Sequence, residues 1–257
     1  MILSRRVAFG GVQLDELDAS IVIRSVDPGM ARETVTAVNR MGGAGQRITS
    51  EHWETIEANV SFAINLPKRQ LAERKQVWDK VIAWANRKDW LTFNYIEGRR
   101  LYVDKVIFPD SGDMWAWMDE FTLTFRAYNV PFWQDETAAS VTGDVTNGRL
   151  WLDIPGNVRG VLDVTAQNIS GMTIQNFKVT AGGSVIELKG INLGGSETLS
   201  ISHGTDGLLR ITAGSRNLYS LYQGSDDLFV YPGSCAIDIA TQRAVRVTAA
   251  CNGRWIG

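Results

Sequence analysis

The sequence predicts an α+β N-terminal domain, in which one helix covers a β-sheet, followed by an all-β domain of the sandwich type. A strand-like alternation over residues 56–64 runs into a helix-like spacing over residues 71–85. After residue 135 the chain becomes a series of short apolar segments separated by Gly, Asn, Asp and Ser. An aromatic cluster around Pro131 lies between the two patterns. We therefore expect domains at residues 1–134 and 135–257.

The first half is expected to hold one long strand and one amphipathic helix. From residue 56 to residue 64 every second position is apolar, as in a strand with one buried face. Pro67 is expected to open the helix, because proline is tolerated in the first turn. Apolar residues then recur at helical spacing from Leu71 to Ala85. Arg87 and Lys88 would suit its C-terminal end, where the helix dipole favours cations.

A three-stranded meander is expected after the helix, and weaker strands before it. The meander strands are predicted at residues 90–96, 101–108 and 115–125. The weaker strands are predicted at residues 9–12, 21–23 and 35–38. A glycine-rich run at residues 41–46 is expected to be a mobile loop or arm. It lacks the lysine and the following helix of a phosphate-binding Walker loop.

The aromatic cluster predicts a junction between the two domains. Phe121, Leu123 and Phe125 alternate with polar residues, so a half-buried strand leads into it. Pro131 fixes its own φ and removes a backbone donor, so regular pairing should stop there. Tyr128, Phe132 and Trp133 are expected to pack on one or both domains, because a solvated linker rarely exposes so much aromatic surface. An ordinary β-bend with local packing is the alternative.

The second half reads as a run of short strands with turn residues between them, a pattern that favours a β-sandwich. The segments are residues 161–164, 173–179, 185–188, 199–201, 208–211, 228–230, 236–239 and 244–247.

Composition limits the possible functions. The 26 Lys and Arg against 28 Asp and Glu give a net charge of −2, so there is no global electrostatic reason to bind nucleic acid or anionic lipid. The N-terminus has no apolar run of signal-peptide length and no segment is long enough for a membrane helix, so we expect folding in the cytoplasm. We expect Cys235 and Cys251 to be buried free thiols rather than a disulfide, because two thiols in a chain without a signal peptide are more often buried small apolar side chains.

Catalysis finds little support. Neither His52 nor His203 stands at a metal-ligand spacing from Cys, Asp or Glu. His203 is expected in a surface hairpin loop, and the nucleophile motif Gly-x-Ser-x-Gly is absent. Residues 113–120 combine acids with tryptophans, as a glycoside hydrolase cleft might, but this segment leads directly into a strand. We expect no catalytic residues, no metal and no cofactor.

Two binding functions remain as alternatives. The nine tryptophans could stack on sugars, although Trp78 and Trp84 fall on or beside the apolar stripe of the helix. A basic strip for single-stranded nucleic acid is weaker, because Arg99, Arg100 and Lys105 are scattered around a hairpin and a solvated face explains them.

The order of elements is more specific than any motif. It begins with Phe9-Gly10-Gly11-Val12-Gln13-Leu14, continues through the strand, the helix and the three-strand return, and reaches Pro131-Phe132-Trp133. The second half opens with Gly156-Asn157-Val158, has a Tyr231-Pro232-Gly233-Ser234 turn, and closes with Cys251-Asn252-Gly253-Arg254-Trp255. This order resembles that of the distal tail proteins of long-tailed (siphovirus-type) bacteriophages, over nearly the whole chain.

The resemblance implies a galectin-like β-sandwich after the junction and a hexameric ring formed by the N-terminal domains. The genome would pass through the ring, with the tail tube protein on one side and the baseplate hub or tip protein on the other. It implies a virion protein assembled in the host cytoplasm, and no catalysis. The chain has no room for the large carbohydrate-binding insertions of some longer members. A soluble carbohydrate-binding module is the alternative, and a glycoside hydrolase a more distant one.

A ring also needs interfaces that close, and an extended arm can supply them by strand pairing. The predicted oligomer or docking loop consists of Arg40, Met41, Gly42, Gly43, Ala44, Gly45, Gln46 and Arg47. The predicted interdomain junction residues are Tyr128, Pro131, Phe132 and Trp133. The mild net charge suits a channel through which DNA slides, because a strongly basic lumen would bind phosphates.

Overall fold

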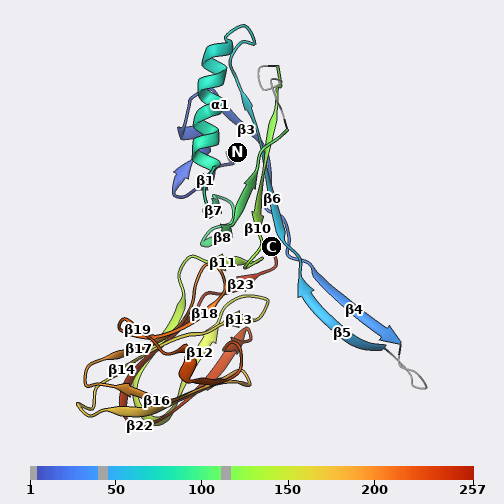
Figure 1. Cartoon of the computed structure of the whole chain (residues 1–257). Coiled ribbons are helices and arrows are strands. Elements are labelled where there is room, and N and C mark those ends of the chain that lie inside the picture. Colours follow the sequence, from blue (N-terminus) through green and yellow to red (C-terminus); the bar gives the residue numbers. More distant parts are fainter. Residues whose placement is uncertain (1–4, 40–45, 111–116) are drawn as a thin grey trace. The chain divides into compact units, whose positions relative to one another are not determined.

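The computed structural model describes residues 5–39, 46–110 and 117–257. It divides into two compact units: Met1–Trp133 with Ile256–Gly257, and Gln134–Trp255. The chain therefore passes from one unit to the other twice, after Trp133 and again after Trp255. As predicted, the described part of the chain is mostly β with a single α-helix, α1 (Leu71–Ala85) (Figure 1).

Two sheets build the body of the first unit. One has the strand order β2-β1-β7-β8, and the other has the order β3-β6-β10-β9. The first comprises β1 (Val7–Phe9), β2 (Val12–Gln13), β7 (Asp89–Phe93) and β8 (Arg99–Val103). The second comprises β3 (Ile21–Asp27), β6 (Ile56–Ile64), β9 (Lys105–Ile107) and β10 (Phe121–Ala127). The 3-10 helix η1 (Leu14–Glu16) follows β2, and β11 (Trp133–Asp135) spans the boundary between the units.

Helix α1 covers these sheets with a tryptophan-rich face (Figure 1). Trp78 stacks on Phe121 of β10 at a centroid distance of 4.8 Å. One helical turn and a half further on, Trp84 contacts Phe9 of β1 edge-on and donates its indole N–H to the carbonyl of Val12 (2.9 Å). The two tryptophans thus join the helix to both sheets, which is the role that helical spacing predicts for them.

The ends of α1 differ from the prediction. The helix begins at Leu71, and Pro67 instead starts a turn in which Gln70 N–H donates to the Pro67 carbonyl (2.9 Å). The helix ends at Ala85, so Arg87 lies beyond its last turn and donates to the carbonyl of Phe9 (2.9 Å). Arg87 therefore makes a hydrogen bond to strand β1 in place of the predicted interaction with the helix dipole.

The predicted meander is also divided between the two sheets. Strand β8 pairs with β7, whereas β9 pairs with β10 in the other sheet. The chain changes sheets at Asp104, whose N–H donates to the carbonyl of Arg126 (2.9 Å). A polar residue between two apolar segments therefore marks the change of sheet.

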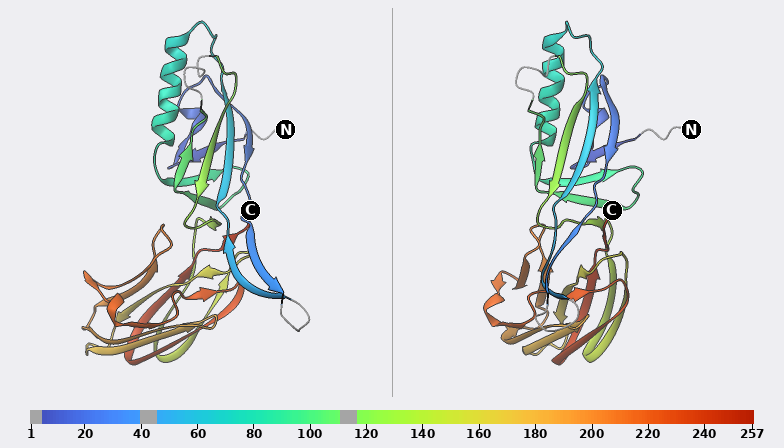
Figure 2. Two further views of the ribbon diagram at one scale, coloured as in Figure 1. Left: turned by 45° about the vertical axis from the view of Figure 1, so that its right-hand side comes forward. Right: turned by 90° about the vertical axis from the view of Figure 1, so that its right-hand side faces the viewer.

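The second unit is a set of curled strands compatible with the predicted β-sandwich (Figure 2). Its main strands are β12 (Ala139–Ile154), β14 (Asp163–Asn168), β15 (Ile174–Ala181), β16 (Ser184–Leu193), β17 (Thr198–His203), β18 (Leu209–Ala213) and β22 (Gly233–Cys251). Short elements complete it: β13 (Gly160–Val161), β19 (Arg216–Asn217), η3 (Tyr219–Leu221), β20 (Tyr222–Gly224), β21 (Phe229–Val230) and β23 (Arg254–Trp255).

Strand β22 is the common neighbour of β12, β14 and β15. Residues 237–241 pair with β15, and residues 245–250 pair with β14. Strand β12 pairs along almost the whole length of β22, with a register shift between Val145 and Asn147. Inward side chains from these strands form one apolar core, in which Phe177, Leu188 and Val247 are almost fully buried.

Candidate functional site

In the sequence, the predicted docking loop falls between two strands that pair with each other. Arg40, Met41, Gly42, Gly43, Ala44 and Gly45 fall outside the described residues, and Gln46 and Arg47 begin β5. Strands β4 (Glu33–Asn39) and β5 (Gln46–Trp53) pair with each other in a two-stranded sheet of their own (Figure 1). The sequence indicated a short strand at residues 35–38, but not this long paired ribbon.

Apolar side chains are exposed on the hairpin. Val35 is 46% exposed, Val38 49% and Ile48 53%. The register places Ala37 opposite Ile48, and alternation along β4 places Val35 on the same face. Val38 belongs to the opposite face. Apolar positions exposed on both faces of a two-stranded ribbon are typical of a surface that another chain covers.

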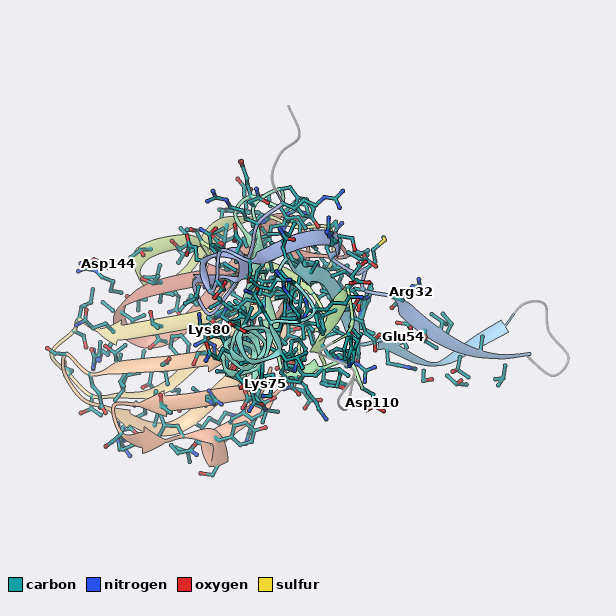
Figure 3. The ribbon with its side chains drawn as sticks, turned by 90° about the horizontal axis from the view of Figure 1, so that it is seen from above. Arg32, Glu54, Lys75, Lys80, Asp110 and Asp144 are labelled. Carbon is teal, nitrogen blue, oxygen red and sulfur yellow. The ribbon has the colours of Figure 1, made fainter. Side chains whose placement is uncertain are left out.

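The root of the hairpin is fixed to the first unit. Glu54 N–H donates to the carbonyl of Arg32 (2.8 Å), which joins the two strands where they leave the body (Figure 3). Trp53 contacts Phe132 edge-on at a centroid distance of 5.0 Å. Ala31 N–H donates to the carbonyl of Ile256 (2.7 Å).

A polar groove of about 610 Å³ lies at this root. Its lining contains three carboxylates and one guanidinium among the residues Asp27, Gly29, Met30, Arg32, Glu54, Thr55, Glu57 and Asn59. Glu57 is paired with Arg126 (2.7 Å). With Glu57 paired, the remaining lining charges are the carboxylates of Asp27 and Glu54 and the guanidinium of Arg32, a small acidic excess. Exposed Met30 contributes an apolar side chain.

The predicted junction residues have different environments within the first unit. Trp133 is fully buried beside Phe93 and donates its indole N–H to the carbonyl of Pro28 (3.3 Å). Phe132 is 5% exposed and Pro131 is buried. Tyr128 is 45% exposed, and its hydroxyl accepts a hydrogen bond from Arg126 (3.3 Å).

Sequence reasoning missed Asp104 as a partner of this segment. Its carboxylate accepts hydrogen bonds from the backbone N–H groups of Tyr128 (2.8 Å) and Asn129 (3.0 Å), and from the Asn129 amide (2.6 Å). Asp104 therefore holds the turn that leads to Pro131. An acid between two apolar segments was the available signal, but its partners are 24 and 25 positions away.

His203 is not the surface-loop histidine that the sequence suggested. It ends β17, and its side chain is 5% exposed. Nδ1 lies 2.8 Å from Asp163 and Nε2 lies 3.1 Å from Asp227. The imidazole thus ties β14 to the segment before β21. Within the described ranges, no group of three or more His, Cys, Asp or Glu residues is arranged to hold a metal ion.

The segment considered for glycoside hydrolysis lies only partly in the described structure. Residues 111–116 fall outside it. Asp119 forms an exposed ion pair with Lys68 (3.0 Å), and Trp117 is 62% exposed. Asp119 is therefore part of a surface ion pair.

Both cysteines are free, buried thiols. Burial raises the pKa of Cys251 to about 12 and also raises that of Cys235. Thiols with such pKa values are weak nucleophiles at neutral pH. In the described part of the chain, no helix is long and apolar enough to cross a membrane.

Among solved structures the chain is similar to the SPP1 Dit (gp 19.1) protein, described as a paradigm of the hub adsorption apparatus in phages that infect Gram-positive bacteria. The identity is 13%, the TM-score is 0.67, and the match covers 97% of this chain and 98% of that one. At this identity the likeness establishes a shared fold.

Two further matches are chains of the phage p2 baseplate in its activated conformation. One, with strontium, has 9% identity and a TM-score of 0.46, and covers 96% of this chain and 97% of the other. The other, with calcium, has 8% identity and a TM-score of 0.47, and covers 98% of each chain. At these TM-scores neither carries an argument. No family model and no curated protein matches the sequence.

Proposed function

We propose that this protein is a distal tail protein of a long-tailed bacteriophage, with a structural and not an enzymatic role. The observation that carries the proposal is the fold shared with the SPP1 Dit protein over almost the full length of both chains. The order of sequence elements supports it independently, because the sequence alone resembles the same family.

In this proposal the first unit forms a hexameric ring and the second unit is a galectin-like sandwich. The ring connects the tail tube protein to the baseplate hub or tip protein, and DNA passes through its lumen. The protein is assembled in the host cytoplasm and remains in the virion. A net charge of −2 supports passage without tight binding, since DNA affinity comes largely from neutralised phosphates.

The β4–β5 hairpin is proposed as the arm that joins neighbouring copies, with residues 40–47 at its end as the docking loop. A two-stranded ribbon is at best marginally stable by itself in water, and pairing with another chain would cover its edges and its exposed valines. A ring interface is heterologous, so an arm on one copy meets a different surface on the next.

The arm is tested by placing charges on one of its faces. The double variant Val35→Asp, Ile48→Asp should remain folded but fail to form hexamers, because two carboxylates cannot be buried without partners. Native mass spectrometry and negative-stain imaging would show loss of the ring. Leu208→Asp, at a 64% exposed position in the second unit, is the matched control and should leave the ring intact.

Two results would reject parts of this proposal. A wild-type protein that stays monomeric even with its tail tube and hub partners would reject the ring. Hexamers formed by the double variant would reject the arm while leaving the ring in place.

We also propose that Tyr128, Pro131, Phe132 and Trp133 fix the orientation of the second unit. Phe132→Leu should loosen the edge-on contact with Trp53 while keeping the site apolar, and so increase interdomain mobility. NMR relaxation would measure this as separate tumbling of the two units. Trp117→Leu, at an exposed aromatic position in the same unit, is the control. If the two units move relative to each other no more in Phe132→Leu than in the wild type, this role is excluded.

A further inference from the structure

An open groove of about 400 Å³ lies on the second unit, next to the turn between β15 and β16. Side chains that line it include Thr180, Tyr231, Ser234, Ala236 and Asp238. Gly182 and Gly183 form the turn itself, so this wall of the groove is backbone without side chains. Such a wall leaves room for a ligand to approach backbone groups closely.

The strand register places further groups beside the groove. Thr180 lies opposite Asp238, and Asp238 lies opposite Arg149 on β12. In the next outward row Ala236 lies opposite Trp151. Directly opposed residues share a face of the sheet, with Cβ atoms about 5 Å apart. The groove, the guanidinium and the indole therefore occupy one continuous outer surface.

Two aromatic side chains on this surface are unusually exposed. Trp151 is 59% exposed and Tyr231 is 59% exposed. Ala236 is the small cross-strand neighbour of Trp151. The Arg149 guanidinium lies 5.7 Å from the centre of the Trp151 ring. Beside a groove, an exposed tryptophan presents a large apolar ring face that a ligand can cover.

The charges beside the groove cancel. Arg149 Nε lies 2.7 Å from Asp238 Oδ1 and Arg149 Nη2 lies 2.9 Å from Oδ2, a bidentate pair. Arg149 lowers the pKa of Asp238, so the carboxylate stays ionised at neutral pH. Asp238 is the one charged residue among those that line the groove, and its partner neutralises it. The groove lining, with Arg149 as the partner of Asp238, thus offers fixed donors and acceptors without net charge.

We infer that this surface binds a neutral pyranose unit of a saccharide, with the sugar's C–H face on Trp151 and its hydroxyls toward Asp238, Arg149 and Thr180. A pyranose combines an apolar face with a rim of neighbouring hydroxyls, and a planar bidentate ion pair beside an indole matches both. A phosphate or a uronic acid would meet the Asp238 carboxylate, whose partner Arg149 is already engaged in the ion pair. The inference does not depend on the proposed role in a phage tail.

The test uses full-length protein and saturation-transfer NMR. The probes are methyl β-D-glucopyranoside, methyl β-D-galactopyranoside and methyl N-acetyl-β-D-glucosaminide, with methyl β-D-glucuronide as the anionic comparison. At least one neutral glycoside should receive saturation, most strongly at its C–H protons, and the glucuronide should receive less.

Variants identify the surface. Trp151→Ala should weaken binding about tenfold or more, Trp151→Phe should restore part of it, and Asp238→Asn should weaken it by removing an ionised acceptor. Tyr219→Ala removes an exposed aromatic side chain that does not line the groove, so binding should be unchanged. Matching thermal unfolding midpoints would show that the variants are folded.

The inference is overturned if no neutral glycoside binds the wild type, if Trp151→Ala binds as well as wild type, or if Tyr219→Ala loses binding to the same extent. Equal binding of the glucuronide would overturn the selectivity for a neutral sugar. None of these results would change the oligomeric state, so they leave the proposed ring untouched.

Discussion

Arg74 shows how one side chain can join three segments of the first unit. It lies on the inner face of α1 and is 2% exposed. Its guanidinium donates to the carbonyls of Ile64 (3.0 Å), Leu66 (2.9 Å) and Met118 (2.7 Å). Ile64 ends β6, Leu66 follows it, and Met118 precedes β10, so Arg74 ties the ends of two strands to the helix. The Ile64 carbonyl also accepts a hydrogen bond from Leu66 N–H (2.9 Å).

Arg74→Leu should therefore cost about 3 kcal/mol in the free energy of unfolding, because the carbonyls lose charged donors and stay partly buried. Urea denaturation would measure the difference. Lys75→Leu is the matched control: Lys75 lies on the exposed face of the same helix, where its ion pair with Asp79 should contribute less than about 1 kcal/mol. A loss for Arg74→Leu no larger than for Lys75→Leu would contradict this role.

The ionisation of Asp18 should make the free energy of unfolding of the first unit depend on pH in the acidic range. Lys80 of α1 (2.8 Å) and Ser20 lower its pKa from 3.8 to about 2. A carboxylate with a depressed pKa stabilises the fold above its unfolded pKa, and the effect disappears as the pH falls toward its folded pKa. Its contribution is thus complete above about pH 4 and lost near pH 2.

Asp18→Asn should unfold more easily than wild type at pH 7, by about 1 kcal/mol or less because Lys80 is half exposed. Chemical denaturation at a series of pH values would show the two proteins converging between about pH 4 and pH 2. A difference that is unchanged at pH 2 would mean that the ionised carboxylate is not the source.

At the scale of elements, the turn between β15 and β16 offers a test with two neighbouring glycines. Gly182 has φ +55° and a Cβ there would lie 2.2 Å from the carbonyl oxygen of Phe229. Gly183 has φ +87° and a Cβ there would meet nothing within 4 Å. Both residues adopt the left-handed backbone region, which favours glycine. Only at Gly182 would a side chain also collide with neighbouring backbone.

Gly183→Ala should cost about 1 kcal/mol from backbone strain alone, and Gly182→Ala should cost clearly more, about 2 to 4 kcal/mol. Differential scanning calorimetry of the two variants would separate strain from the clash, because each serves as the control for the other. Equal losses would show that the Phe229 segment moves aside without cost.

Local patterns predicted the elements that depend on local periodicity. The alternation at residues 56–64 became β6, and the helical spacing at residues 71–85 became α1. By contrast, no strand was predicted at β12, whose centre, Asn147-Gly148, has the composition of a turn. In the structure these residues continue the strand beyond a bulge, where the Asn147 side chain accepts a hydrogen bond from Thr241 N–H (3.2 Å). That partner is 94 positions away.

The candidate site shows the same limit. The glycine run lies between β4 and β5 in the sequence. The pairing of these strands and the exposure of Val35 and Ile48, however, depend on what the remaining chain leaves uncovered. The carboxylates of Asp163 and Asp227 are likewise far from His203 in sequence, and the register of β14 with β17 brings one of them to it. Contacts of this kind cannot be derived from spacing.

At the scale of the whole molecule, each of the two units has its own arrangement of strands. The first unit includes the last two residues of the chain, and these contact the segment before the hairpin through Ala31. The second unit is thus an insertion within the covalent path of the first. This arrangement is consistent with the division of roles proposed above, in which the first unit assembles and the second presents a binding surface.

The pairing of β12 with β22 also determines the order in which the second unit can form during synthesis. Thr142 and Thr248 face each other although 106 positions separate them. Strand β22 is also the strand that joins β14 to β15. Until β22 leaves the ribosome, β12, β14 and β15 lack their common neighbour. Closing so long a loop carries an entropic cost before any of these contacts forms, so the second unit completes its fold only after β22 has been synthesised.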